Sequence, residues 1–413
     1  MKALSVGILT GWLAALCGSA AAAAPALPTA DQNALVQGGA AFALDLYGQL
    51  ASRPGNLFFS PYSVSSALAM TYGGAAGQTA EQMAKTLHLD LPSPRLHAAF
   101  GALNQALNVG GQKGGYSLSV ANALWGQRGS EFLAPFRDLV RTGYGAGLRV
   151  LDFRDDAEGA RKTINDWVAV HTNGKIKDLI APGVLDRLTR LVLTDAIYFK
   201  GDWEREFQRQ RTSDQLFYVK PGQTIQAPLM TQVADFGYLE GEGFQAVEMV
   251  YRGGDVALVA FLPRERFGLA ALEKGLSADS LRLWLGRLQD QRVAVHFPRF
   301  KMTEQFALAG QLQALGMLDA FSSKADFSLM NGKRPGDLEA LSISDVIHKA
   351  FVEVNEQGTE AAAATAVVMK RAMAMRPGPP VPEFRADHPF LFLIRDRRSG
   401  AILFLGRVVE PRS

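Results

Sequence analysis

The residues that could do catalytic chemistry in this sequence are not spaced for any familiar active site. None of its six histidines forms a His-x-x-x-His pair, and the chain has neither a Gly-x-Ser-x-Gly nucleophile turn nor a phosphate-binding loop. Its one cysteine, Cys17, excludes an internal disulfide framework and any zinc site built on several cysteines. We therefore predict that the chain is not an enzyme and needs neither a metal nor a cofactor.

The chemistry of the chain is concentrated in one unusual segment, residues 356–382. More than thirty residues separate Asn355 from Pro389, and connections of that length between strands are usually functional loops. The first part, up to Met375, contains no proline and is rich in small residues, whereas the last part is proline-rich and cannot enter the interior of a sheet. The front half can therefore become a strand, and the back half cannot.

The alternation of small side chains supports this interpretation. Five residues that would share one face of such a strand are small or β-branched and would fit a close-packed sheet: Thr359, Ala361, Ala363, Thr365 and Val367. Gly358 precedes them and would give the backbone a flexible pivot. The alternative is a surface helix nucleated by the alanines.

The remaining sequence indicates a mixed body of helices and strands. Apolar periodicity and capping residues predict helices at 31–50, after Ser60-Pro61, at 79–87 with Thr79 as the cap, and at 154–177. Alternating or continuous apolar runs predict strands at 117–125, 191–199, 256–262, 292–297, 351–355, 391–394 and 402–408. We find no internal repeat and no linker, so we expect an α+β fold around a large sheet.

The amino-acid composition limits the classes of partner that we expect for this chain. Lysine and arginine number 43 against 40 aspartate and glutamate, so a nucleic-acid partner has no electrostatic basis. Hydrophobic residues make up 48% of the chain, which is typical of a folded protein. No apolar stretch beyond the amino terminus reaches the roughly 18 to 20 residues that a membrane span requires.

The amino terminus has the pattern of a targeting segment. Lys2 precedes an apolar run that ends in small residues at Ala22-x-Ala24, which predicts a Sec-type signal peptide at residues 1–24 and a secreted or periplasmic product. Leu16 suits a lipoprotein site poorly, so we expect no lipid anchor at Cys17. This segment, with the scarcity of cysteine and the lack of Asn-x-Ser/Thr sites, suggests a bacterial exported protein.

Four ordered motifs make the chain resemble the serpin family of serine protease inhibitors. They are the runs at 56–63, at 197–203, at 348–362 and at 384–394, which read NLFFSPYS, IYFKGDW, HKAFVEVNEQGTEAA and FRADHPFLFLI. The resemblance covers residues 31–411 and implies one serpin domain at 25–413. That fold has a large mixed central β-sheet, two smaller sheets, about eight or nine helices and an exposed reactive-centre loop, here at about 356–382.

The resemblance also implies a function. The loop is bait for a serine protease, which forms an acyl-enzyme with it, and the cut loop then enters the central sheet as an extra strand and disables the attached protease. The expected partner is therefore a serine protease bound covalently to a monomeric inhibitor. The segment that binds heparin in some serpins would lie at 92–107, and with only Arg95 and His97 there we expect no heparin site.

Family roles carry over to matching positions. The hinge of the loop comprises Glu356, Gly358, Thr359, Ala361, Ala362, Ala363 and Ala364. The region where the sheet opens comprises Ser60, Ser63, Asp195 and His348, and Asp195 departs from the asparagine of the family pattern. That departure could alter the local hydrogen bonding, pair the carboxylate with His348, or make the region sensitive to pH. At the top of the sheet Arg299 is expected to pair with Glu356, near Trp203.

The family spacing also selects the bond to be cut. The scissile residue stands fourteen positions after Gly358, which gives Ala372 followed by Met373. A small residue there favours an elastase-like or subtilisin-like protease. Cleavage after Arg371 by a trypsin-like enzyme and a chymotrypsin-like cut at Met373 or Met375 are the alternatives. The rival function is a non-inhibitory serpin, a carrier, chaperone or plain substrate, but such relatives often carry bulky hinge residues, and the small ones here favour inhibition.

Overall fold

Two β-sheets and a set of helices packed against them form the fold of this computed structural model, which describes residues 29–112, 115–144, 148–359 and 381–412. In this part of the chain ten α-helices are present. They are α1 (Ala30–Leu50), α2 (Pro61–Tyr72), α3 (Gly77–Thr86), α4 (Ser93–Gln112), α5 (Ala134–Tyr144), α6 (Ala157–His171), α7 (Leu269–Lys274), α8 (Ala278–Gly286), α9 (Ala309–Ala314) and α10 (Ser328–Asn331).

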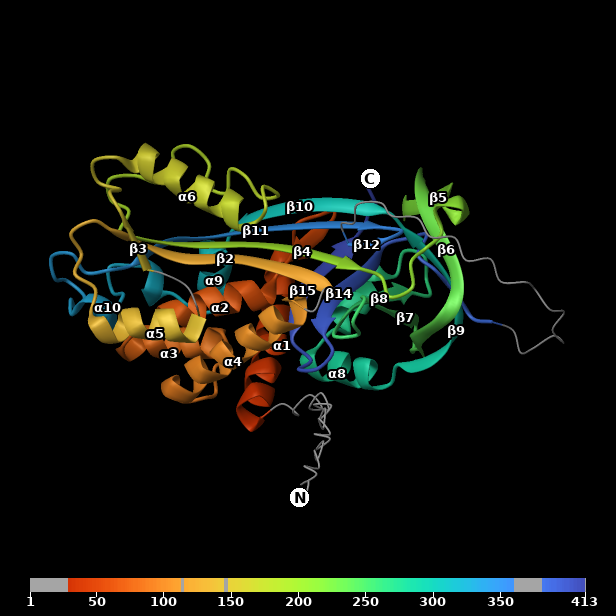
Figure 1. Cartoon of the computed structure of the whole chain (residues 1–413), viewed down its shortest axis with the longest axis horizontal. Helices are drawn as coiled ribbons and strands as arrows, with labels where there is room; N and C mark the ends of the chain where they lie inside the picture. The colour runs from red at the N-terminus through yellow and green to blue at the C-terminus, as the bar shows by residue number, and fades with distance from the viewer. Residues whose placement is uncertain (1–28, 113–114, 145–147, 360–380, 413) are drawn as a thin grey trace, which may run out of the picture.

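The six-stranded sheet runs along the long axis of the molecule (Figure 1). Its strands, in spatial order, are β10 (Phe300–Ala307), β11 (Ile343–Asn355), β12 (Gly358–Thr359), β4 (Leu191–Asp202), β2 (Tyr116–Gln127) and β3 (Leu148–Leu151). Below the short β12, strands β11 and β4 pair directly with each other in parallel, whereas β2 and β10 run antiparallel to their neighbours β4 and β11. The sheet is therefore mixed.

The other sheet has nine strands and forms one end of the molecule (Figure 1). Its strands are β1 (Leu57–Phe59), β5 (Ser213–Lys220), β6 (Gln223–Glu240), β7 (Phe244–Val250), β8 (Val256–Pro263), β9 (Gln289–Pro298), β13 (Glu383–Arg385), β14 (Phe390–Asp396) and β15 (Ile402–Val408). The long strand β6 pairs with β5, β9 and β7 in turn. It thereby joins the remaining strands into one sheet, where the family resemblance implies two smaller ones.

The two faces of the six-stranded sheet are covered differently (Figure 1). Helix α6 packs on one face, against β2, and its Ile164 and Val168 join one apolar cluster with Ala121 of β2 and Ala196 of β4. On the other face lies α2, which is buried along nearly its whole length. Its small residues allow it to lie directly under β4 and β2.

Helix α1 and the last strand form as their local patterns predict. The predicted inward side of α1 is buried at Leu35, Phe42, Ala43, Leu46 and Leu50, and β15 spans residues 402–408 as expected. Thr29 and Gln32 cap α1 by exchanging hydrogen bonds. The α+β single-domain fold is therefore confirmed.

Two helices were predicted with wrong boundaries. Helix α3 begins at Gly77, and Thr79 does not cap it, because its buried hydroxyl accepts the backbone N–H of Asp326 at 2.9 Å. The helix predicted at 154–177 is shorter and spans Ala157–His171, with the Asp156 side chain accepting the N–H of Gly159 at its start. A long-range contact of Thr79 therefore removes the predicted cap of α3. The capping side chain of Asp156 sets the start of α6.

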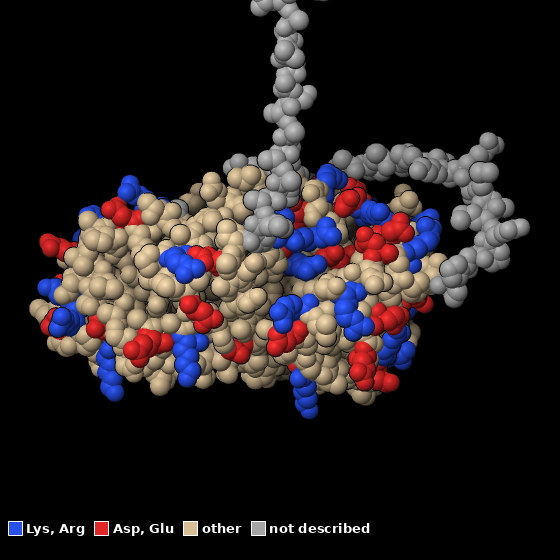
Figure 2. Space-filling view, turned by 90° about the horizontal axis from the view of Figure 1, so that it is seen from below, with Lys and Arg blue, Asp and Glu red and all other residues tan. Residues whose placement is uncertain are grey.

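The charged surface is mixed. On the face shown in Figure 2, acidic and basic side chains are interspersed, and neither sign forms an extended patch. In the part of the chain that the structure describes, no helix is long and apolar enough to span a bilayer.

Candidate functional site: the hinge and the sheet that receives it

The start of the loop is already part of the six-stranded sheet. After β11 ends at Asn355, the chain turns through two residues, and β12 pairs antiparallel with both β11 and β4. Thr359 lies opposite Val354 on one side and Gly201 on the other. The hinge therefore enters the space between these two strands at one end only, because below it β4 and β11 pair with each other.

Gly358 has a steric role at this point. Its φ is +153°, and a Cβ atom there would lie only 2.0 Å from the carbonyl oxygen of Gly201 on β4. A side chain would therefore push the hinge out of the sheet. The flexible pivot predicted from the sequence is also a residue that must be small for the strands to meet.

The carboxylate of Glu356 anchors the turn. It is almost fully buried and accepts hydrogen bonds from the Arg299 guanidinium, at 2.7 Å from Nε, and from the Thr212 hydroxyl at 2.6 Å. Burial acts to raise the pKa of Glu356, but these hydrogen bonds together outweigh it and lower the pKa below its ordinary value. The structure thus brings together Arg299 and Glu356, which the sequence paired through the family pattern.

The segment after β4 holds the hinge backbone. The Trp203 indole N–H donates to the backbone carbonyl of Asn355 at 2.9 Å. The Trp203 backbone N–H donates to the backbone carbonyl of Gln357 at 2.7 Å. The N–H of Phe207 donates to the carbonyl of Glu356 at 2.8 Å. Three consecutive hinge carbonyls are therefore fixed by one short segment, residues 203–207.

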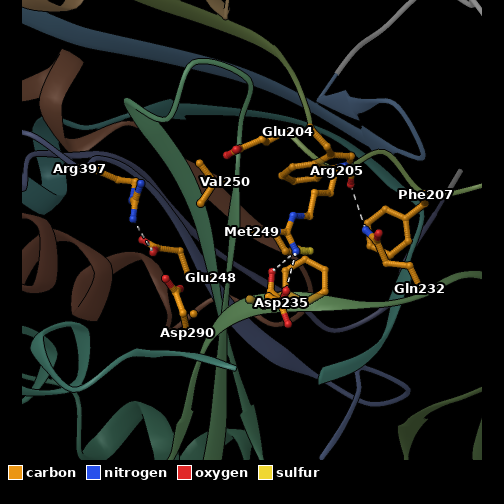
Figure 3. Close-up of a pocket in the computed structure, with 13 residues that line it drawn as sticks. Glu204, Arg205, Phe207, Gln232, Asp235, Glu248, Met249, Val250, Asp290 and Arg397 are labelled. Atoms are coloured by element: carbon orange, nitrogen blue, oxygen red, sulfur yellow. Dashed lines mark hydrogen bonds and ion pairs between the residues drawn. The ribbon is translucent and has the colours of Figure 1, made fainter. Parts of the chain in front are cut away.

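A cavity of about 450 Å³ lies behind this segment (Figure 3). Arg205 crosses it to donate to the backbone carbonyl of Asp235 on β6 at 2.9 Å, and Gln232 donates back to the carbonyl of Arg205 at 3.0 Å. On the far wall Arg397 lies 3.5 Å from Glu248. The two contacts of Arg205 tie the segment that holds the hinge to the nine-stranded sheet.

The predicted sheet-opening residues meet lower down, where β4 and β11 are paired. Asn122, Asp195 and His348 lie side by side on β2, β4 and β11. Under them lies the amino end of α2, where the hydroxyl of Ser63 donates to Oδ1 of Asp195 at 2.5 Å. The Ser60 side chain caps the helix by accepting the N–H of Ser63 and donates to the carbonyl of Leu403 on β15 at 2.6 Å.

The hydrogen bonds define the state of His348. Its Nε2 accepts the backbone N–H of Ser60 at 3.0 Å, so the ring proton of the neutral imidazole belongs on Nδ1. Nδ1 lies 3.2 Å from Oδ1 of Asp195, but the angle does not make a hydrogen bond, and Oδ2 of Asp195 has no hydrogen-bond partner among the described residues. This is a neutral histidine beside a carboxyl group rather than an ion pair with an imidazolium.

Sequence reasoning missed two partners in this site. Asn122 donates to the carbonyl of Ser63 at 2.9 Å, and Thr212 completes the bonding of Glu356. No local sequence signal distinguishes either residue, because each becomes a partner only through strand pairing or a distant turn. The predicted hinge residues Ala361, Ala362, Ala363 and Ala364, and the predicted cleavage residues Arg371, Ala372, Met373 and Met375, lie outside the described residues, as do residues 1–24 and Cys17.

The first residues of the loop thus lie between β4 and β11. Comparisons with known proteins define the class of the protein. The model of the family described as "Serpin (serine protease inhibitor)" matches residues 37–411. The chain therefore belongs to the serpin family. It is a serpin protease inhibitor and not an enzyme.

Individual relatives are similar over nearly their whole length. Leukocyte elastase inhibitor A of Rattus norvegicus is 43% identical over 381 residues, covering 90% of this chain and 97% of that protein. The leukocyte elastase inhibitor of Homo sapiens is 42% identical with the same coverage, and Serpin B6 of Pongo abelii is 41% identical over 92% of this chain and 100% of its own length. Human thyroxine-binding globulin with its hormone has a TM-score of 0.83 at 30% identity, covering 93% of this chain and 100% of that one. Uncleaved ovalbumin has a TM-score of 0.80 at 30% identity, covering 92% and 100%.

These relatives correct the prediction of export. Leukocyte elastase inhibitors and Serpin B6 belong to an intracellular group of serpins that lack a signal peptide, which points away from secretion. The secreted or periplasmic location predicted from residues 1–24 is therefore wrong, since a short apolar run ending in small residues is only a compositional signal. The comparisons likewise give no support to a bacterial source.

Replacing Arg299 with Gln tests the anchor of the turn. The change leaves the buried Glu356 carboxylate with the Thr212 hydroxyl as its remaining side-chain donor, and we expect a loss of about 3 kcal/mol in unfolding free energy, read from the urea midpoint. Since the folded pKa of Glu356 is lowered, the anchor contributes fully above the ordinary glutamate pKa of about 4.3 and loses its contribution as pH falls through the folded value. Arg205→Gln, which breaks an exposed contact, should cost under about 1 kcal/mol. Equal losses in the two variants would contradict the anchor.

Replacing Asp195 with Asn tests the buried carboxyl group. A neutral amide with one unpaired group costs less to bury than a carboxylate with one unpaired oxygen, so we expect the intact protein to gain about 1 kcal/mol or more of stability. Asn122→Asp in the same row should do the reverse, because it adds a carboxylate and removes the donor to Ser63. Thermal scans at one fixed rate compare the three proteins. A lower melting temperature for Asp195→Asn would contradict this account.

Proposed function

We propose that this serpin inhibits an elastase-like serine protease as a suicide substrate. The observation that carries the proposal is that Gly358 and Thr359 already pair with both β4 and β11, so that the rest of the loop can follow them between these strands. The names of the leukocyte elastase inhibitors, which are up to 43% identical to the chain, support an elastase-like target.

The proposed reaction begins as ordinary proteolysis. The serine Oγ of the protease attacks the carbonyl carbon of Ala372, the bond to the nitrogen of Met373 breaks, and the new amine leaves with the proton from the serine. The loop is now joined to the protease by an ester and is free at one end. Insertion of about fourteen residues at roughly 3.3 Å each would carry that ester about 45 Å along the sheet before water can hydrolyse it.

The driving force comes from the strand pairing. Insertion replaces the parallel contact between β4 and β11 by two antiparallel contacts, one on each side of the new strand. At about 0.5–1.5 kcal/mol for each added hydrogen bond, the gain is on the order of 10 kcal/mol. That is comparable with the stability of a whole domain, so the uncut form is held by a kinetic barrier.

The protease preference rests on the sequence of the loop. Ala372 suits the small pockets of elastase-like and subtilisin-like enzymes, while Arg371 offers a trypsin-like enzyme a bond one residue earlier. Met373 and Met375 leave a chymotrypsin-like target as a further alternative. The bond that is cut distinguishes these targets.

Incubation with pancreatic elastase and, separately, with trypsin tests the proposal. We expect a complex with elastase that survives denaturing gels, and a released peptide that mass spectrometry shows to begin at Met373. A peptide beginning at Ala372 would instead identify a trypsin-like target. Cleaved inhibitor should also melt well above the intact form, because the added strand contributes on the order of 10 kcal/mol. Clean cleavage with neither a complex nor a rise in melting temperature would support the non-inhibitory rival.

Thr359→Arg tests whether the hinge must enter the sheet. The Thr359 side chain is fully buried, and a charged arginine cannot be accommodated there without leaving the sheet. We expect the variant to be cleaved at the same bond and to release active protease, so that its complex yield on gels falls at least about tenfold. Thr142→Arg, on the exposed face of α5, is the matched control and should form the complex as the unmodified protein does. Full inhibition by Thr359→Arg would refute the insertion mechanism.

A further inference from the structure

Thr359 has one side-chain partner in the described structure, and that partner comes from outside the six-stranded sheet. Its hydroxyl lies 2.7 Å from the phenol oxygen of Tyr251, a residue in the turn between β7 and β8. Both residues have no exposed surface. Since water cannot replace either partner, each hydroxyl depends on the other.

Tyr251 is held rigidly in this position. Its ring stacks on Trp203 with centroids 4.4 Å apart and planes at 13°, and it meets the edge of Phe199 at 5.0 Å. Its backbone N–H donates to the carbonyl of Val256 at 2.9 Å. None of these contacts involves Thr359, and together they fix the phenol beside the end of β4 where the hinge pairs.

The neighbouring strand is shaped around this ring. A Cβ atom on Gly201 would lie 2.8 Å from the Tyr251 ring, so β4 has room for the phenol only because glycine stands there. Gly201 is also the residue that pairs with Thr359. Backbone pairing with β4 and the hydroxyl contact with Tyr251 thus hold the same hinge residue.

We propose that Tyr251 is a positioning residue for loop insertion, which seats Thr359 in the sheet before the loop is cut. This inference rests on the proposed function and adds how insertion begins. Ordering the first residues of a new strand costs conformational entropy before the later pairs repay it. A hinge that is already seated has met this cost, so the cut loop enters faster than the ester is hydrolysed.

The protonation of the phenol suits this role. Burial raises the pKa of Tyr251, so its hydroxyl keeps its proton and can donate at any pH at which a protease works. The contact between Tyr251 and Thr359 is therefore independent of pH, in contrast to the hydrogen bonds of the Glu356 carboxylate.

The direct test is Tyr251→Phe, with Tyr47→Phe as the matched control. Tyr47 is also buried and loses a comparable hydrogen bond, to Glu273 at 2.6 Å, but it lies on α1 away from the hinge. In the intact protein we expect amide hydrogen exchange at residues 356–359 to become about tenfold faster in Tyr251→Phe and to be unchanged in Tyr47→Phe.

The functional readout is the number of inhibitor molecules consumed for each pancreatic elastase molecule trapped. We expect this number to rise severalfold in Tyr251→Phe, with the rate of loop cleavage unchanged, because the phenol affects insertion and not recognition. Thr359→Val removes the other half of the contact and should have a similar effect. The double variant should be no worse than either single one, since all three lose the same bond.

Several outcomes would overturn the inference. Exchange and stoichiometry equal to those of Tyr47→Phe would show that the contact does not seat the hinge. Faster association with elastase at unchanged stoichiometry would show that the contact withholds the loop instead of preparing it. The exchange measurement needs no protease, so it separates failure of the seat from failure of the proposed function, which appears as an absence of complex in the unmodified protein.

Discussion

The pairing of β4 with β11 is the contact on which the rest of the structure depends. These two strands are parallel neighbours from Ile343 to Phe351, whereas each of them is antiparallel to its partner on the other side. Parallel pairs are somewhat less stable per residue than antiparallel pairs. This parallel pair lies at the centre of the sheet. Under the proposed mechanism, a strand entering there from the hinge would form two antiparallel contacts in place of one parallel contact.

The β4–β11 pair must hold while the loop is intact. The row of Asn122, Asp195 and His348 runs across β2, β4 and β11 at this point. Its polar groups bond largely to the amino end of α2, so that the helix bridges β2, β4 and β11 from below. Separation of the strands has to break or rearrange these buried bonds, each of which is costly to leave unmade. The carboxyl group of Asp195, with one oxygen unpaired, makes this bridge less complete than a fully bonded amide would. Under the proposed mechanism, the bridge would supply part of the barrier to insertion, and replacement of the parallel pairing would supply part of the driving force.

Local sequence patterns were enough to find most elements but not the contacts between them. The inward face of α1 and the span of β15 follow from apolar periodicity, which a short window of sequence contains in full. Thr79 was misread as a cap because its partner Asp326 lies 247 residues away. The partners of the hinge are equally remote, with Thr212 separated from Glu356 by 144 residues and Tyr251 from Thr359 by 108. Strand register creates these pairs, and a single sequence without the fold carries no trace of register between distant strands.

Two sets of side-chain contacts hold the hinge, one at Glu356 and one at Thr359, and they have different consequences. Arg299 and Thr212 donate hydrogen bonds to Glu356, which lies in the turn before β12. Under the proposed mechanism, Glu356 need not move when the loop enters the sheet. Tyr251 contacts Thr359, the last described residue before the part of the loop that the proposed mechanism inserts. The first contact fixes where the loop leaves β11, and the second fixes the direction in which it continues. Gly358 lies between them, and the carbonyl of Gly201 leaves no room for a Cβ atom there. If the loop inserts as we propose, the pairing of Gly358 and Thr359 with β11 and β4 would set the register of the new strand, and so the end of the sheet that the attached protease reaches.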